Sequence, residues 1–276
     1  KTELGWILSG PTIADGTDSP TSLHCVDESN LMDLVEKFWK QEELTVTGKI
    51  LTPEEQFCEK HFLDNYTQTS EGRYMVRLPF IPNKLSSLDI KLGDSYNLAL
   101  KTLLSMEKKF SKNPVFKEKY LDFMKEYETL SHMELSPPLN TEQRENAFFL
   151  PHHGVLHHNK LRTVFNGSAK VGGTSLNDCL YPGPNLIPEL YALLLKWRRY
   201  PLVFTTDIVK MFRQVLVHPL DRQYQLILWK SELKEIVTYV LKTITYGLRC
   251  SPYLAIRTLI QIAKDYGHLF PLAATI

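Results

Sequence analysis

The stretch FTTDIVKMFRQVLVHPLD, residues 204–221, carries the strongest indication of the fold. It begins as an apolar, threonine-rich run, which predicts a buried strand, and it places one acid, Asp207, inside that run. A carboxylate is costly to bury unless it is paired, hydrogen-bonded or bound to a metal. The residues therefore leave three explanations open: an acid on an edge strand, an ion pair with Lys210 or Arg213, and a metal ligand.

The segments on both sides of this stretch predict strands and helices in alternation. QYQLILWK and EIVTYVLKTITYG should pair across a turn at residues 231–234, and SPYLAIRTLIQIAKDYG predicts a helix that ends at Gly267. Upstream, FFLPHHGVLHHNKLRTVFNGS predicts a hairpin. LIPELYALLLKWRRY predicts a helix whose inward side chains are Leu190, Leu193, Leu194 and Trp197.

The first half of the chain is more helical and more charged. Helices are expected at LMDLVEKFWKQEEL, at TPEEQFCEKHFLDNY after the N-cap Thr52, and twice between residues 95 and 135 with a break at Asn113 and Pro114. EGRYMVRLPF predicts a strand that Pro79 ends. The expected fold class is α/β in the α+β sense. We expect the chain to divide into a tail and linker (1–30), a mostly helical connector (31–136) and a third region (137–276).

Composition limits the location and the partners. Basic residues number 32 and acidic residues 31, so a nucleic-acid surface would need local segregation of charge. Four widely spaced cysteines favour buried thiols in a reducing compartment, and hence an intracellular, cytoplasmic protein. No apolar run approaches the roughly 20 residues of a membrane span. The missing initiator Met and the C-terminus in mid-run suggest a piece of a longer protein.

Four histidines in the expected hairpin raise the question of a metal site. On a strand, His152 and His158 share one face, whereas His153 and His157 share the other. Neither face then offers more than two imidazoles, fewer ligands than a structural zinc site uses. We therefore expect a polar hairpin.

The order of the segments resembles the palm of reverse transcriptases. An aromatic residue, Phe212, follows Asp207 by five positions, and Gly247, Ser251 and Pro252 have the spacing of a Gly-x-x-x-Ser-Pro loop that enters a helix. LPHHGVLHHNKLRTVFNGSAKVGGTSLNDCLYPGPNL is similar to the fingers segment of the Pao/BEL family of LTR retrotransposon polyproteins. FWKQEEL, EGRYMVRLPF and SYNLALKTLLSMEKKF resemble their connector, and KTELGWILSGP resembles the end of their aspartic protease.

The resemblance implies incomplete fingers and palm of an RNA-directed DNA polymerase that uses two Mg²⁺ ions. Asp207 would supply a bridging carboxylate and Ile208 a backbone carbonyl, both hard oxygen ligands. Phe212 would lie under the sugar of the incoming nucleotide and exclude a 2′-hydroxyl. Ordinary core packing remains the alternative for Phe212.

The same resemblance assigns the triphosphate and the base of the incoming nucleotide. Lys160 and Arg162 in the hairpin would contact phosphate oxygens, and Tyr246 and Gly247 would lie against base and sugar. A solvated surface hairpin and a turn-capping glycine are the alternatives. His157 stands where the family usually has Lys, and Asn166 where it has Asp.

The implied partners are an RNA or DNA template-primer, deoxynucleoside triphosphates and the rest of the Pol polyprotein. The second metal motif, Tyr-x-Asp-Asp, would follow Ile276, and the chain has no Asp-Thr-Gly or Asp-Ser-Gly, so the fragment itself should complete neither polymerisation nor proteolysis. Two alternatives remain: a noncatalytic nucleic-acid-binding or protein-interaction module from a retroelement, and part of an aspartic peptidase region.

Overall fold

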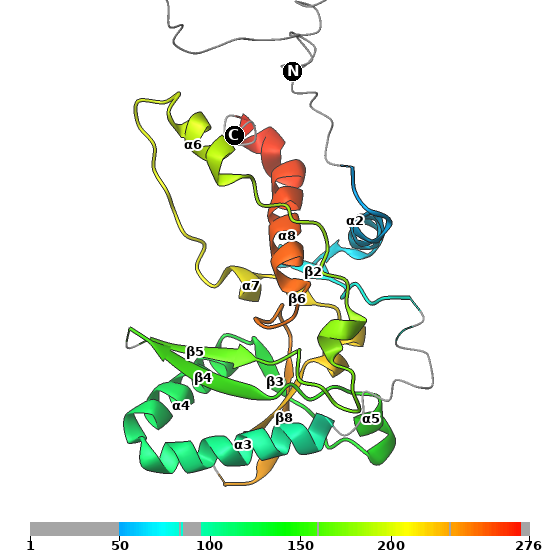
Figure 1. Ribbon diagram of the computed structural model, residues 1–276, viewed down its shortest axis with the longest axis vertical. Helices are drawn as coiled ribbons and strands as arrows, with labels where there is room; N and C mark the ends of the chain where they lie inside the picture. Colours follow the sequence, from blue (N-terminus) through cyan, green and yellow to red (C-terminus); the bar gives the residue numbers. More distant parts are fainter. Residues whose placement is uncertain (1–49, 83, 85–94, 159, 232, 272–276) are drawn as a thin grey trace, which may run out of the picture. The chain divides into compact units, whose positions relative to one another are not determined.

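The computed structural model describes residues 50–82, 84, 95–158, 160–231 and 233–271. The expected helix at residues 31–44, the protease-like tail and Cys25 lie outside these residues. Residues 51–276 cluster as one unit, separate from residues 1–50. The unit combines helices and sheets, which confirms the expected α+β class (Figure 1).

The longer helices agree with the predicted positions, whereas the short ones were not predicted. Longer helices are α2 (Pro53–Asn65), α3 (Ser95–Lys112), α4 (Pro114–Thr129), α6 (Leu190–Trp197) and α8 (Ser251–Tyr266). The short ones are α5 (Thr141–Glu145), α7 (Met211–Gln214), η2 (Leu176–Cys179), η3 (Pro219–Tyr224) and η4 (Gly267–Leu269).

Strands form three small sheets. The first has the order β1 (Thr67–Gln68), β2 (Tyr74–Val76), β6 (Leu216–Val217), and the second has the order β3 (Met133–Leu135), β8 (Ile236–Leu241), β7 (Leu226–Lys230). The third is the hairpin of β4 (His152–His157) and β5 (Lys160–Phe165). β2 pairs in parallel with β6, and β3 pairs antiparallel with β8. Strands from before residue 136 therefore pair with strands from after it, so two of the sheets join the expected second and third regions.

Local signals explain where several helices begin. The Thr52 hydroxyl accepts a hydrogen bond from the Glu55 amide, and the Glu55 carboxylate accepts one from the Thr52 amide, which completes a capping box before α2. The Asn113 side chain caps α4 by accepting a hydrogen bond from the Phe116 amide, and Pro114 is the first residue of the helix. These contacts confirm the predicted N-cap of α2 and the predicted break between α3 and α4.

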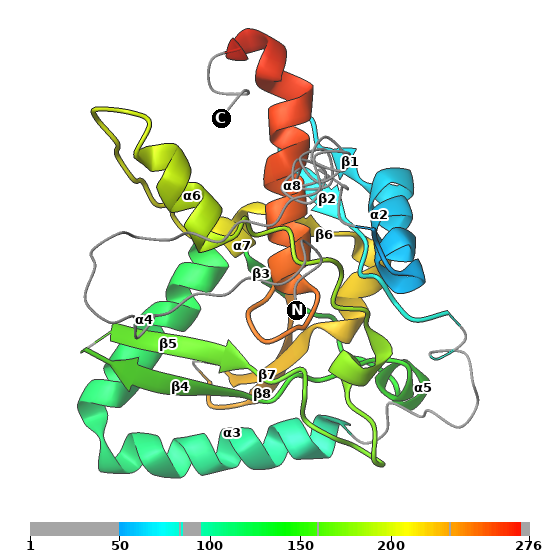
Figure 2. The same cartoon turned by 45° about the horizontal axis from the view of Figure 1, so that its top comes forward.

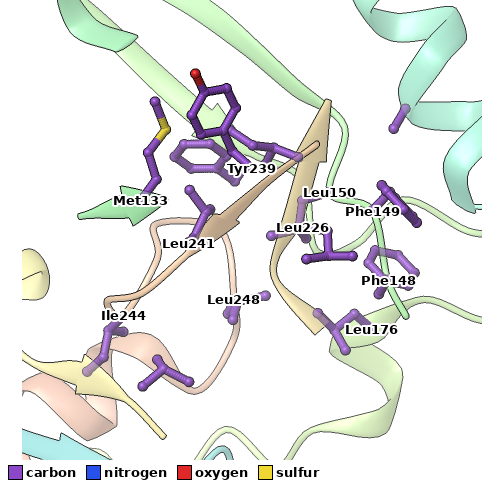
Figure 3. Close-up of a cluster of buried hydrophobic side chains, with 14 of the residues drawn as sticks. Met133, Phe148, Phe149, Leu150, Leu176, Leu226, Tyr239, Leu241, Ile244 and Leu248 are labelled. Carbon is purple, nitrogen blue, oxygen red and sulfur yellow. The ribbon is translucent and has the colours of Figure 1, made fainter. Parts of the chain in front are cut away.

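The main core lies between the second sheet and two segments, one that leads into β4 and one that follows β5. Figure 3 shows Met133, Leu226, Tyr239 and Leu241 of this sheet together with Phe148, Phe149 and Leu150 from the segment that leads into β4. Leu176, Ile244 and Leu248 complete this part of the cluster. Residues far apart in sequence are thus joined in one apolar interior, the largest stabilising contribution to a domain of this size.

The hairpin is attached to this core through His152. Its ring is buried beside Tyr120 and Trp229, which stack on each other with centroids 5.4 Å apart. His152 Nε2 donates to the Leu228 carbonyl at 2.9 Å, so Nδ1 of a neutral ring is the acceptor for the Tyr120 hydroxyl. Both ring nitrogens are therefore used inside the protein.

This burial predicts a pH-dependent stability. Burial disfavours the charged ring and lowers the pKa of His152 from 6.5 to about 4, although the hydrogen bond to the Leu228 carbonyl acts in the opposite direction. Between these values the unfolded chain binds a proton that the folded chain does not, so stability present above pH 6.5 is lost as the pH falls. From pH 7.5 to pH 5 this histidine should cost about 2 kcal/mol.

Urea unfolding of the wild type and of His152→Gln at both pH values measures this contribution. Glutamine retains hydrogen-bonding capacity but does not titrate, so the variant should lose about 2 kcal/mol of the pH dependence whatever its absolute stability. An unchanged pH dependence in His152→Gln would contradict the assignment.

The inward orientation predicted for four side chains of α6 is wrong for Leu190 and Leu194, whereas Leu193 and Trp197 are partly buried. The helix forms at Leu190–Trp197, but none of its residues is buried, and Leu190 is 68% exposed. Helical periodicity identifies an apolar face but does not supply an element to cover it. In the part of the chain that the structure describes, no other helix or strand makes an extensive contact with α6, and Leu190 and Leu194 stay exposed.

Candidate nucleotide site

Phe212 and Tyr246 are brought into contact although 34 positions separate them in the sequence. Their rings stack with centroids 4.5 Å apart and an interplanar angle of 29°. Phe212 is half-buried at the edge of the core, whereas Tyr246 is 42% exposed. The pair therefore presents an aromatic surface that is neither plain core nor fully solvated.

Gly247 follows Tyr246 in the chain, and its backbone conformation and close packing require a glycine. Its φ is +109°, and a Cβ at this position would lie 1.8 Å from the carbonyl oxygen of Phe165, the last residue of β5. Only glycine allows this approach. The loop that carries Tyr246 and Gly247 is thus pressed against the base of the β4–β5 hairpin.

Asn177 holds this loop from a third segment. Its side-chain amide donates to the Gly247 carbonyl at 2.9 Å and to the Ser168 hydroxyl at 2.8 Å, while its side-chain oxygen accepts from the Arg249 amide at 2.9 Å. One asparagine therefore fixes the loop on both sides of Leu248. Sequence reasoning missed Asn177, since nothing in its local pattern points to a partner 70 residues away.

The hairpin displays its two basic candidates on one face. Arg162 lies opposite Val155 and Lys160 lies opposite His157, and both basic side chains are exposed. Neither residue has an ion pair within the described residues. The face thus offers one permanent ammonium and one guanidinium to an anion.

The predicted central strand at Phe204–Phe212 is wrong. Residues 202–208 are extended but pair with no strand of the described chain, and α7 already begins at Met211. Leu202 is 87% exposed and Phe204 90%. An apolar sequence with strand propensity becomes a strand only where a neighbour offers backbone partners.

Asp207 lies in this exposed segment. It has no ion pair among the described residues, because Lys210 and Arg213 both contact Glu126 instead, at 3.0 and 2.7 Å. The alternative of an ion pair with Lys210 or Arg213 is therefore wrong. The carboxylate is free to bind a ligand from solution.

Glu126 anchors α7 to α4. Burial opposes ionisation of its carboxylate, but hydrogen bonds from Lys210 and Arg213 outweigh this effect and lower the pKa of Glu126. The Arg213 guanidinium also lies over the Tyr127 ring, 4.4 Å from its centroid. Lys210 has a left-handed φ of 53°, so the ion pair stabilises a turn that side chains rarely adopt.

Ile208 has two separate environments. Its backbone carbonyl accepts from the Met211 amide at 3.3 Å, in the turn that enters α7. Its side chain lines a mostly apolar groove of about 350 Å³ with Met211, Thr258, Ile262 and Tyr266. The carbonyl oxygen keeps one lone pair for a further ligand.

The oxygens at Asp207 and Ile208 are of the kind that Mg²⁺ prefers, but they form only part of a ligand set. Among the residues described, no group of three or more His, Cys, Asp and Glu side chains converges. At this place, Asp207 and Ile208 therefore offer one carboxylate and one carbonyl oxygen.

Comparison of the chain with protein-family models and with curated proteins finds no match. In the described part of the chain, no helix combines the length and the apolar character needed to cross a bilayer. A functional interpretation therefore depends on the geometry above and on the resemblance of the sequence segments.

Proposed function

We propose that the chain is the fingers and part of the palm of an RNA-directed DNA polymerase from a Pao/BEL-like retroelement, together with its helical connector. Its partners would be an RNA or DNA template-primer, deoxynucleoside triphosphates and the remaining Pol polyprotein, inside the cell. The stacked Phe212 and Tyr246 rings carry the proposal. The resemblance assigns both residues to one nucleotide, and only a specific fold brings them together.

Two further observations are consistent with a nucleotide at this place. The loop that carries Tyr246 and Gly247 packs directly against Phe165, so the aromatic pair is joined to the hairpin. Lys160 and Arg162 of that hairpin have no competing carboxylate in the described chain. Point charges and guanidinium forks are the groups that proteins use for phosphate oxygens.

The metal chemistry would require a second acidic motif. Mg²⁺ activates the primer 3′-hydroxyl and stabilises the developing charge on the transferred phosphoryl group. Asp207 would bind the metal, with the Ile208 carbonyl as a further oxygen, and the exposed segment 202–208 is suited to receive strands that carry the other carboxylates.

The reading frame of the parent gene tests this requirement without an assay. Beyond the codon for Ile276, the frame should encode a Tyr-x-Asp-Asp motif flanked by apolar strands. A frame that continues for the length of a domain without this motif would overturn the polymerase proposal.

A Phe212→Ala substitution in the full-length parent tests the sugar position. If the ring lies beneath the sugar, its removal should raise ribonucleotide incorporation relative to deoxynucleotide incorporation. Stability should fall by only about 1 kcal/mol, because the side chain is half-buried and loses one aromatic partner. Incorporation ratios and a urea midpoint on the same variant measure both effects.

The alternative of plain packing makes the opposite prediction. A core phenylalanine truncated to alanine costs about 3 to 5 kcal/mol and leaves the sugar preference unchanged. That pair of results would remove Phe212 from the nucleotide site.

A noncatalytic interaction module is the second candidate, favoured by the exposed apolar side chains of residues 187–209. Ile187, Tyr191 and Val209 are more than half exposed, as are Leu202 and Phe204. Large exposed apolar patches mark interaction surfaces. The aspartic peptidase alternative concerns residues outside the described chain and stays a prediction.

A further inference from the structure

A second candidate site lies in a groove between α3, α4 and β4, lined by none of the residues assigned to the nucleotide. Figure 2 shows α3 running beside β4. The hollow, which we name the α3–β4 groove, has a volume of about 400 Å³. Its polar lining consists of Lys101, Thr102, Ser105 and Lys109 of α3 together with His153 of β4.

The groove has a positive charge that no neighbouring acid neutralises. No Asp or Glu lines it, and Glu107 on the same helix pairs with Lys230 at 3.2 Å. Lys109 is positioned over the Phe116 ring, with Nζ 4.5 Å from the centroid. Two ammonium groups and the exposed Ser105 hydroxyl are therefore available to an anionic ligand.

The positive charge extends beyond the groove. Lys108 and Lys112 flank Lys109 on α3, and Lys117 is exposed on α4. The whole chain has a net charge of only +1, so this is a local segregation of charge. These lysines together cover more of the surface than a single phosphate group would contact.

We propose that the α3–β4 groove binds the phosphodiester backbone of a single nucleic-acid strand, independently of base sequence. Lysine provides point charges that suit phosphate without reading bases. Phe116, the aromatic ring of the groove, is only 1% exposed and covered by Lys109, so it offers no surface on which a base could stack. The proposal does not require polymerase activity, and Asp207→Asn should bind the strand normally.

Fluorescence anisotropy with a labelled oligothymidylate tests the groove. The double variant Lys101→Gln/Lys109→Gln should bind about tenfold more weakly, and the slope of log K against log salt should fall in magnitude by about 1.4, the value for two lost phosphate contacts of a single strand. Lys125→Gln/Lys264→Gln removes the same charge from exposed positions outside the groove and should retain the slope.

Two additional measurements keep the test decisive. If the double variant is poorly folded by circular dichroism, Ser105→Glu, at an exposed site, places an anion in the groove and should weaken binding several-fold. Inorganic phosphate should displace the oligonucleotide no better than chloride at equal ionic strength. Equal losses in both double variants would overturn the proposal, as would selective displacement by phosphate, which would assign the groove to a single phosphate group.

Discussion

Replacing Gly247 with alanine should destabilise the protein by about 3 kcal/mol or more. The added Cβ would meet the Phe165 carbonyl oxygen at 1.8 Å, and the position has a φ of +109° that an alanine rarely adopts. The backbone of β5 cannot move away without disturbing the hairpin and its attachment through His152. A shift of the urea midpoint measures the loss.

Gly173→Ala is the matched control for this substitution. Gly173 also has a positive φ, +89°, but no heavy atom lies within 4 Å of its Cβ position. Only the conformational penalty of about 1 kcal/mol should remain. Similar losses in the two variants would show that the close contact between Gly247 and Phe165 does not form.

The second large effect concerns Asp207. In the full-length parent, Asp207→Asn should reduce primer extension to below about 1% of the wild-type rate, because the amide cannot replace an anionic metal ligand. The folded structure should be unchanged, since Asp207 is exposed and has no ion pair in the described chain. Extension rates and thermal melting measure the two halves of this prediction.

Asp122→Asn gives the corresponding control. Asp122 is an exposed acid on α4, and its neutralisation removes the same charge without altering the proposed metal site. It should retain extension. Retained activity in Asp207→Asn would refute the metal role of Asp207.

Those parts of the fold that depend on local chemistry could be predicted from the sequence. Thr52 and Asn113 cap their helices through residues three positions away, and β4 pairs with β5 across a short turn. In each case, the residues that determine the structure are near neighbours in the chain. The predicted helices and hairpins within the described residues were confirmed for this reason.

The errors arose where structure depends on a distant partner. The sequence of residues 202–208 has the composition of a buried strand, but a strand also needs a neighbour with free backbone groups. Leu190 and Leu194 of α6 likewise belong to an apolar pattern but stay exposed among the described residues. Composition indicates what a segment can bury and does not indicate what covers it.

The candidate site shows the same division. Phe212, Tyr246 and Gly247 were identified through the resemblance, and their contacts depend on Asn177 and Glu126, which were not identified. Asn177 acts on Gly247 across 70 positions and Glu126 acts on Arg213 across 87. Such polar contacts leave no periodic pattern in one sequence.

Primer extension by the full-length parent protein is the most direct test of the proposed function. With a primed template, deoxynucleoside triphosphates and Mg²⁺, we expect the primer to lengthen, and we expect chelation of the metal by EDTA to stop the reaction. The 276-residue chain alone should not extend the primer. A folded full-length protein that binds the template-primer but adds no nucleotide with Mg²⁺ would contradict the account.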